Sequence, residues 1–222
     1  MNYTDIKDSI LTSISEIPTP VYTNQVRRCV QQHKKEIMKL PLEDTFVLCE
    51  SFLQSHNRHK TIIGYQIMDY KHKEFTRESY QKLEHFVLTY VSDWWDFDDY
   101  MTHAFMRFYV KYPDILSNVK NWTSHDNFAV RRCAPVLLVI PARKGLADMK
   151  DVFSLCDMVY NDPHYLVLKG YGWLLKEASK HYPKEVINYL ETHVHSMPRT
   201  AFRYALEKLP KEERKRLLLL PR

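Results

Sequence analysis

Apolar residues recur at intervals of three and four positions along most of the chain. Between residues 46 and 53 the apolar side chains are spaced by 3, 3 and 1 positions, and between residues 83 and 90 by 3, 1 and 3. This period places apolar side chains on one face of a helix. Prolines interrupt the pattern, so it predicts about twelve helices joined by short turns: 23–38, 42–55, 59–72, 76–91, 96–111, 114–121, 126–141, 147–160, 164–180, 184–195, 198–208 and 211–219.

Several features repeat at a spacing near 35 residues or its double. Tyr112-Pro113 recurs 70 positions later as Tyr182-Pro183. Steps of 37 and 34, continued upstream by similar steps, join Arg132, Lys169, Arg203, Trp95, Lys60 and the pair Arg27 and Arg28. This period is typical of stacked helix pairs. The sequence therefore predicts an all-α fold, a right-handed α-solenoid of about six HEAT-like helix pairs with a concave basic groove, in one domain over residues 1–222.

The composition supports a helical, reduced protein. Hydrophobic residues make up 45% of the chain and charged residues 27%, but only 4 of the 222 residues are glycine. So few glycines disfavour a sandwich or barrel of tight turns, and no glycine-rich phosphate loop occurs. The 4 cysteines show no CxxC spacing, and the start resembles no signal peptide. We expect a cytoplasmic monomer that has no metal or cofactor and does not enter a membrane.

Positive charge is concentrated in the second half of the chain. Residues 1–100 hold 12 Lys and Arg against 15 Asp and Glu, a net charge of −3, whereas residues 101–222 hold 20 against 12, a net charge of +8. An ordinary solvated surface is one interpretation. A groove for a polyanion is the other, because equivalent positions of a repeat line the same face. The predicted basic track consists of Arg28, Lys60, Arg132, Lys169 and Arg203.

The segment SDWWDFDDY at 92–100 places two tryptophans among four aspartates. The structural interpretation is a helix start, with Asp93 as the N-cap and Trp94 as a core anchor. A divalent-cation site formed by Asp98, Asp99 and His103 is a second interpretation.

The third interpretation of this segment is a catalytic carboxylate beside an aromatic wall. Trp95 and Asp99 are four positions apart, so they share one face of a helix. Acidic groups on a surface that binds a polyanion weaken that binding by repulsion. Stabilisation of a developing cation gives such a carboxylate a purpose.

The motifs WDFDD at 95–99, RRCA at 131–134 and GYGWLLKEASKHYP at 170–183 resemble the bacterial DNA alkylation-repair glycosylases of the AlkD type. The resemblance covers roughly residues 80–210. It implies a HEAT-like solenoid that excises positively charged alkylpurines, such as 3-methyladenine and 7-methylguanine, from duplex DNA without a cofactor or a metal.

The resemblance also assigns roles to individual residues. Trp95 matches a tryptophan that packs against the damaged nucleotide, Asp99 the essential aspartate, and Arg132 an arginine that holds the backbone near the lesion. These three form the expected catalytic set. Trp173 matches a second cleft tryptophan and heads the expected DNA-binding set of Trp173, Arg131, Lys169, Arg203, Arg28 and Lys60.

Three departures leave alternatives open. Ala129 stands where an aromatic residue is expected, Pro135 lies inside the helix that carries Arg132, and the stretch after Asp99 is one residue short. Asp98 is therefore an alternative match to the essential aspartate. The alternative functions are a non-catalytic nucleic-acid-binding paralogue and a protein-interaction solenoid.

Overall fold

The computed structural model describes residues 2–92 and 94–221, apart from the side chains of Trp94 and Asp96. Every regular element in these ranges is an α-helix or a short 3₁₀ helix. This confirms the all-α class that the hydrophobic period predicts. Within the described ranges, none of the helices has both the length and the apolar character that a membrane span requires.

Helix contacts divide the chain into two compact units, residues 1–108 and 109–222, with the boundary inside one helix. The prediction of a single repeat domain over 1–222 stays a prediction. The helices of the first unit are α1 (Tyr3–Ser15), α2 (Thr23–Gln32), α3 (Lys34–Lys39), α4 (Leu42–Leu53), α5 (Arg58–Lys71), η1 (His72–Glu74), α6 (Ser79–Tyr90), α7 (Trp94–Thr102) and the first part of α8 (Ala104–Lys111).

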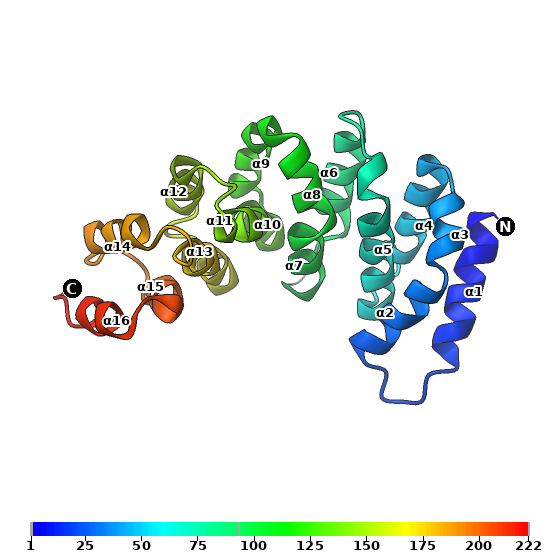
Figure 1. Cartoon of the computed structure of the whole chain (residues 1–222), viewed down its shortest axis with the longest axis horizontal. Helices are drawn as coiled ribbons and strands as arrows, with labels where there is room; N and C mark the ends of the chain where they lie inside the picture. Colours follow the sequence, from blue (N-terminus) through cyan, green and yellow to red (C-terminus); the bar gives the residue numbers. More distant parts are fainter. Residues whose placement is uncertain (1, 93, 222) are drawn as a thin grey trace. The chain divides into compact units, whose positions relative to one another are not determined.

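Helix α5 is the centre of the first unit, where it packs against α2, α4 and α7 (Figure 1). Its start is fixed by Asn57, whose Oδ1 accepts hydrogen bonds from the backbone N–H groups of His59 and Lys60 at 3.0 and 3.2 Å. Such a cap satisfies donors that have no partner inside the helix. Tyr65 of α5 stacks on Tyr100 of α7, with ring centroids 4.6 Å apart and both side chains buried.

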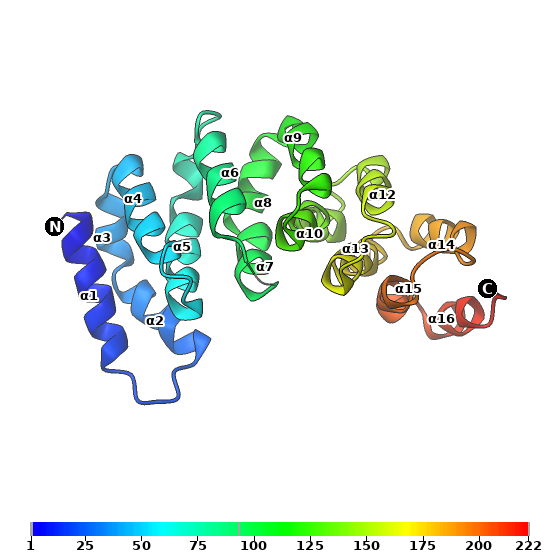
Figure 2. The ribbon, with the colours of Figure 1, turned by 180° about the vertical axis from the view of Figure 1, so that it is seen from behind.

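The second unit is organised around α13, which packs against α10, α11, α12 and α15 (Figure 1, and from behind in Figure 2). Leu174, Leu175 and Val167 of α13 are completely buried and form part of its apolar core. The elements after α8 are η2 (Pro113–Ile115), α9 (Leu116–Asn121), η3 (Trp122–Ser124), α10 (Phe128–Leu137), α11 (Val139–Arg143), α12 (Met149–Met158), α13 (Tyr165–Ala178), α14 (Pro183–Thr192), α15 (Arg199–Ala205), η4 (Leu206–Lys208) and α16 (Lys211–Leu218).

Three ranges predicted as single helices are each divided into two α-helices. The range 23–38 breaks at His33, and 96–111 breaks at His103, whose N–H bonds to the carbonyl three residues back instead of four. The range 126–141 breaks after Leu137, because Pro135 and Pro141 remove N–H donors from that stretch. The first helix, α1, was not predicted at all, although Asn2 caps it by accepting from two backbone N–H groups.

Close packing of α13 on α15 depends on Gly172. A Cβ atom at this position would lie 2.9 Å from the carbonyl oxygen of Ala201 and 3.1 Å from its Cα. Backbone atoms of a neighbouring helix cannot turn aside as a side chain does, so a larger residue would have to push the two helices apart.

We therefore expect Gly172→Ala to lower the free energy of unfolding by about 1–3 kcal/mol, the usual cost of over-packing. The loss should appear despite the gain of about 1 kcal/mol in helix propensity. Urea unfolding followed by circular dichroism measures it. Lys169→Ala, an exposed change on the same helix, is the control and should shift stability by less than about 0.5 kcal/mol. Equal midpoints for both variants would contradict the close approach.

Candidate functional site

The aromatic and acidic cluster predicted at 92–100 forms most of helix α7. Phe97, Tyr100 and Met101 face the core and are completely buried. The hydroxyl of Tyr100 donates to the carbonyl oxygen of Leu83 at 3.2 Å, which fixes the rotation of α7 about its axis. Trp95, Asp98 and Asp99 are only partly buried, so the opposite face of the helix is accessible. Asp93, the proposed N-cap, and the side chain of Trp94, the proposed core anchor, lie outside the described residues.

Asp99 is paired with a cation from a distant helix. The Nη2 atom of Arg27, on α2, lies 2.6 Å from Oδ1 of Asp99. His103, one turn further along the chain, places Nδ1 3.3 Å from the same oxygen and 2.9 Å from the backbone carbonyl of Asp99. The carboxylate is 13% exposed. Asp99 is therefore held between a guanidinium group and an imidazole.

Trp95 also faces a cation. The guanidinium carbon of Arg58, at the start of α5, lies 5.9 Å from the centroid of the Trp95 ring. This distance is within the range in which the negative face of an indole attracts a positive charge. Trp95 and Asp99 thus form a surface, called here the α7 face, on which each of two neighbouring groups already interacts with positive charge.

Two alternatives for the acidic cluster are Asp98 as the key carboxylate and a divalent-cation site. The backbone carbonyl of Asp98 accepts a hydrogen bond from the Thr102 hydroxyl at 2.6 Å. Asp98 stays a second candidate. Among the residues that the structure describes, no group of three or more His, Cys, Asp and Glu side chains is arranged to hold a metal ion.

In the second unit, Arg132 is buried within its own fold. The residue is 5% exposed, and its Nη1 donates to the backbone carbonyl oxygen of Leu166 on α13. The absence of a side chain at Gly170 makes this possible, because a Cβ there would lie 3.1 Å from Cγ of Arg132. The structure therefore gives Arg132 a bond between α10 and α13, while its predicted phosphate contact is untested.

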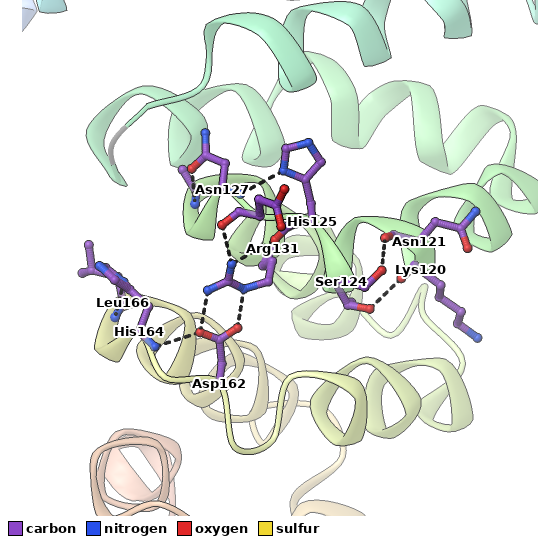
Figure 3. A network of polar contacts seen from close by, with 12 residues as sticks. Lys120, Asn121, Ser124, His125, Asn127, Arg131, Asp162, His164 and Leu166 are labelled. Carbon is purple, nitrogen blue, oxygen red and sulfur yellow. Dashed lines mark hydrogen bonds and ion pairs between the residues drawn. The ribbon is translucent and has the colours of Figure 1, made fainter.

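Arg131 is the centre of a polar network (Figure 3). Its Nε and Nη2 atoms donate to the two carboxylate oxygens of Asp162, and Nη1 donates to the backbone carbonyls of His125 and Asp126 at 2.9 and 2.8 Å. Hydrogen bonding to Asp162 raises the pKa of Arg131 above its ordinary value. Four of its five N–H donors are thus engaged within the fold. The predicted DNA contact of Arg131 would have to share them.

The other predicted DNA-binding residues are more accessible. Trp173 is partly buried on α13, and Lys169 and Arg203 are exposed on α13 and α15. The ammonium group of Lys169 lies 5.4 Å from the centroid of the exposed Tyr165 ring. In the first unit, Arg28 is exposed on α2 and Lys60 is partly buried on α5. The single track that joins these residues across both units stays a prediction.

Sequence reasoning missed the partners of the α7 face. The spacing near 35 residues indicates Arg27 only as the neighbour of Arg28, and it does not indicate Arg58. The spacing of about 35 residues carried a weak signal for Arg27, because 27 lies about two repeats before 99. It could not decide between adjacent arginines, which point about 100° apart on a helix.

These features define a class of protein: an all-α protein whose short helix α7 presents a tryptophan and a carboxylate to positive charge. Comparison with known families gives the assignment. Residues 19–209 match the family model of the DNA alkylation repair enzymes, so the chain belongs to that family.

Comparison with solved structures supports the fold. A protein described as a predicted DNA alkylation repair enzyme from Enterococcus faecalis superposes with a TM-score of 0.75. The superposition covers 94% of this chain and 95% of the other, at 18% sequence identity. At that identity the likeness concerns the fold alone. No curated protein gives a significant match to the sequence.

Proposed function

We propose that the protein is a DNA glycosylase of the AlkD type that excises positively charged alkylpurines from duplex DNA. The observation that carries the proposal is the α7 face, where Trp95 and Asp99 both interact with guanidinium groups. A site that attracts fixed cations is suited to a cationic substrate. Membership of the DNA alkylation repair enzymes supports DNA as the partner.

The chemistry requires little from the protein. An N3- or N7-alkylated purine already carries a positive charge and leaves without protonation. When the C1′–N bond breaks, its electron pair passes to the purine, which becomes neutral, and positive charge develops on the sugar. The Asp99 carboxylate would stabilise that charge and accept a hydrogen bond from the water that attacks C1′. The water then loses a proton to solvent. Trp95 would hold the nucleotide by contact with its indole face.

The remaining predicted residues belong to the same proposal. Trp173, Arg132, Arg131, Lys169, Arg203, Arg28 and Lys60 would contact the DNA backbone. The helices would be arranged as HEAT-like pairs, which the spacing near 35 residues supports. Neither step of the proposed chemistry uses a metal or an organic cofactor.

The test is release of alkylpurines from methylated duplex DNA, with the products separated by chromatography. We expect 3-methyladenine and 7-methylguanine to be released by the wild-type protein. DNA affinity should also fall steeply with salt, because each phosphate contact releases about 0.9 counterion. Salt-sensitive binding without release would favour the non-catalytic paralogue. Binding that is absent or insensitive to salt would favour a protein-interaction solenoid.

A further inference from the structure

The proposed chemistry needs two groups of the α7 face, and each of them is already in contact with an arginine side chain. Arg27 lies on the carboxylate of Asp99 and Arg58 lies over the ring of Trp95. Both arginines come from other helices, α2 and α5. The free protein therefore already satisfies, with its own cations, the positions where a cationic nucleotide would bind.

This arrangement conflicts with the proposed chemistry unless an arginine moves. The Arg27 nitrogen is 2.6 Å from Oδ1 of Asp99, so a cationic sugar at the same carboxylate would face a second positive charge at close range. The carboxylate cannot neutralise both groups. A second acceptor for the guanidinium is therefore required, and a DNA phosphate near the lesion is the anion that binding itself supplies.

The contacts of Arg27 would allow its guanidinium group to move from Asp99 to a DNA phosphate. Its backbone is held, because Nε2 of Gln66 donates to its carbonyl oxygen at 3.1 Å. Within the described residues, Asp99 is the only hydrogen-bonding partner of its guanidinium group. That side chain is 37% exposed, so a phosphate can reach it from solvent. A fixed backbone with an accessible charged end suits a group that changes partners.

We propose that Arg27, which is paired with Asp99 in the free protein, binds a DNA phosphate in the complex. In the free protein the pair neutralises both charges, which reduces repulsion between Asp99 and approaching DNA. When DNA binds, Arg27 transfers to a phosphate and leaves Asp99, with His103 still beside it, without its guanidinium partner and open to the cationic nucleotide. This inference rests on the proposed function and adds to it a residue that couples DNA binding to exposure of the carboxylate.

A rival role for Arg27 makes a different prediction. If Arg27 stays on Asp99 in the complex and only positions it, then Arg27 makes no phosphate contact in the wild-type protein, and Arg27→Gln should leave the salt dependence of DNA binding unchanged, whereas the exchange predicts that the slope falls by about 0.9. The exchange requires that Asp99 and Arg27 be energetically coupled in DNA binding. A double-mutant cycle measures such coupling directly.

The experiment measures binding to a duplex that contains a tetrahydrofuran abasic-site analogue, which cannot be cleaved, by fluorescence anisotropy at low salt. Asp99→Asn should tighten binding about fivefold, which corresponds to releasing Arg27 from one partly exposed ion pair worth about 1 kcal/mol. In an Arg27→Gln background the same change should tighten binding less than about twofold. The difference should shrink as salt is raised. Thermal melts confirm that all four proteins fold.

The control is Asp151→Asn, which removes the same charge from an ion pair on α9 and α12, where Lys120 lies 2.8 Å from Asp151. The change in DNA affinity caused by Asp151→Asn should be the same with Arg27 present and in the Arg27→Gln background. Equal tightening by Asp99→Asn in both backgrounds would reveal simple relief of repulsion and overturn the exchange, as would no tightening at all. If neither the wild-type protein nor any variant binds DNA, both this inference and the proposed function are contradicted. Binding with zero coupling overturns this inference alone.

Discussion

Asp99→Asn is expected to lower alkylpurine release about 10²- to 10³-fold, the effect of removing one preorganised electrostatic group from a reaction centre. Asparagine keeps the shape of the side chain but carries no negative charge to stabilise the cationic sugar. The proposed leaving group is already charged, so protonation by another residue cannot speed its departure. Stabilisation of the cationic sugar by Asp99 therefore has no substitute. Single-turnover release from methylated duplex DNA, with enzyme in excess, measures the chemical step apart from binding.

Two further variants make this result specific. Asp69→Asn makes the same change in another Asp–Arg pair of the first unit, where Nε of Arg107 lies 2.7 Å from Asp69, and it should retain activity within about threefold. Asp98→Asn tests the alternative carboxylate. Loss of release in Asp98→Asn with activity retained in Asp99→Asn would transfer the catalytic role to Asp98. Loss in all three variants would indicate a structural defect and contradict a specific role for Asp99.

Asp162→Ala is expected to lower the free energy of unfolding by about 3–5 kcal/mol, the usual cost of breaking a buried ion pair by removing one partner. The side chains of Asp162 and Arg131 are 5% and 14% exposed, so water cannot readily replace the lost carboxylate. The variant would also lose a helix-start contact, because Asp162 accepts from the backbone N–H of His164 at 2.8 Å. Chemical unfolding followed by tryptophan fluorescence measures the change.

Asp126→Ala is the matched control for this stability effect. Asp126 is exposed and contacts Arg131 through its backbone carbonyl, which the substitution keeps. We expect a change below about 1 kcal/mol. Similar losses for both variants would contradict a special role for the buried pair. The double variant Arg131→Met with Asp162→Leu should recover part of the stability, because two apolar side chains leave no charge unpaired.

The helical architecture was largely predictable because apolar spacing reports directly on helix faces. The breaks were less so. His33 and His103, where α2 is separated from α3 and α7 from α8, carry no proline or glycine signal. The first helix has a recognisable cap in Asn2, but its short apolar stripe gave the pattern little to repeat.

The candidate site was only partly predictable. Spacing four positions apart was enough to place Trp95 and Asp99 on one face of a helix, and the structure has them on α7. Their partners depend on how α2 and α5 pack beside α7, which no local pattern encodes. For Arg131 and Arg132 the sequence showed two cations in a basic half. It could not show that Asp162 and the carbonyl of Leu166 hold them inside the second unit.

The Arg27–Asp99 pair also has a consequence for the order of folding. Most packed helices here are near neighbours along the chain, as α4 and α5 or α13 and α15 are, so their contacts close short loops and form early. Arg27 and Asp99 are 72 positions apart, and we expect their bond to close after α2 and α7 have both docked on α5. A nascent or partly folded chain thus carries Asp99 without its counterion. The charge balance of the α7 face is a property of the finished unit, acquired at the end of its assembly.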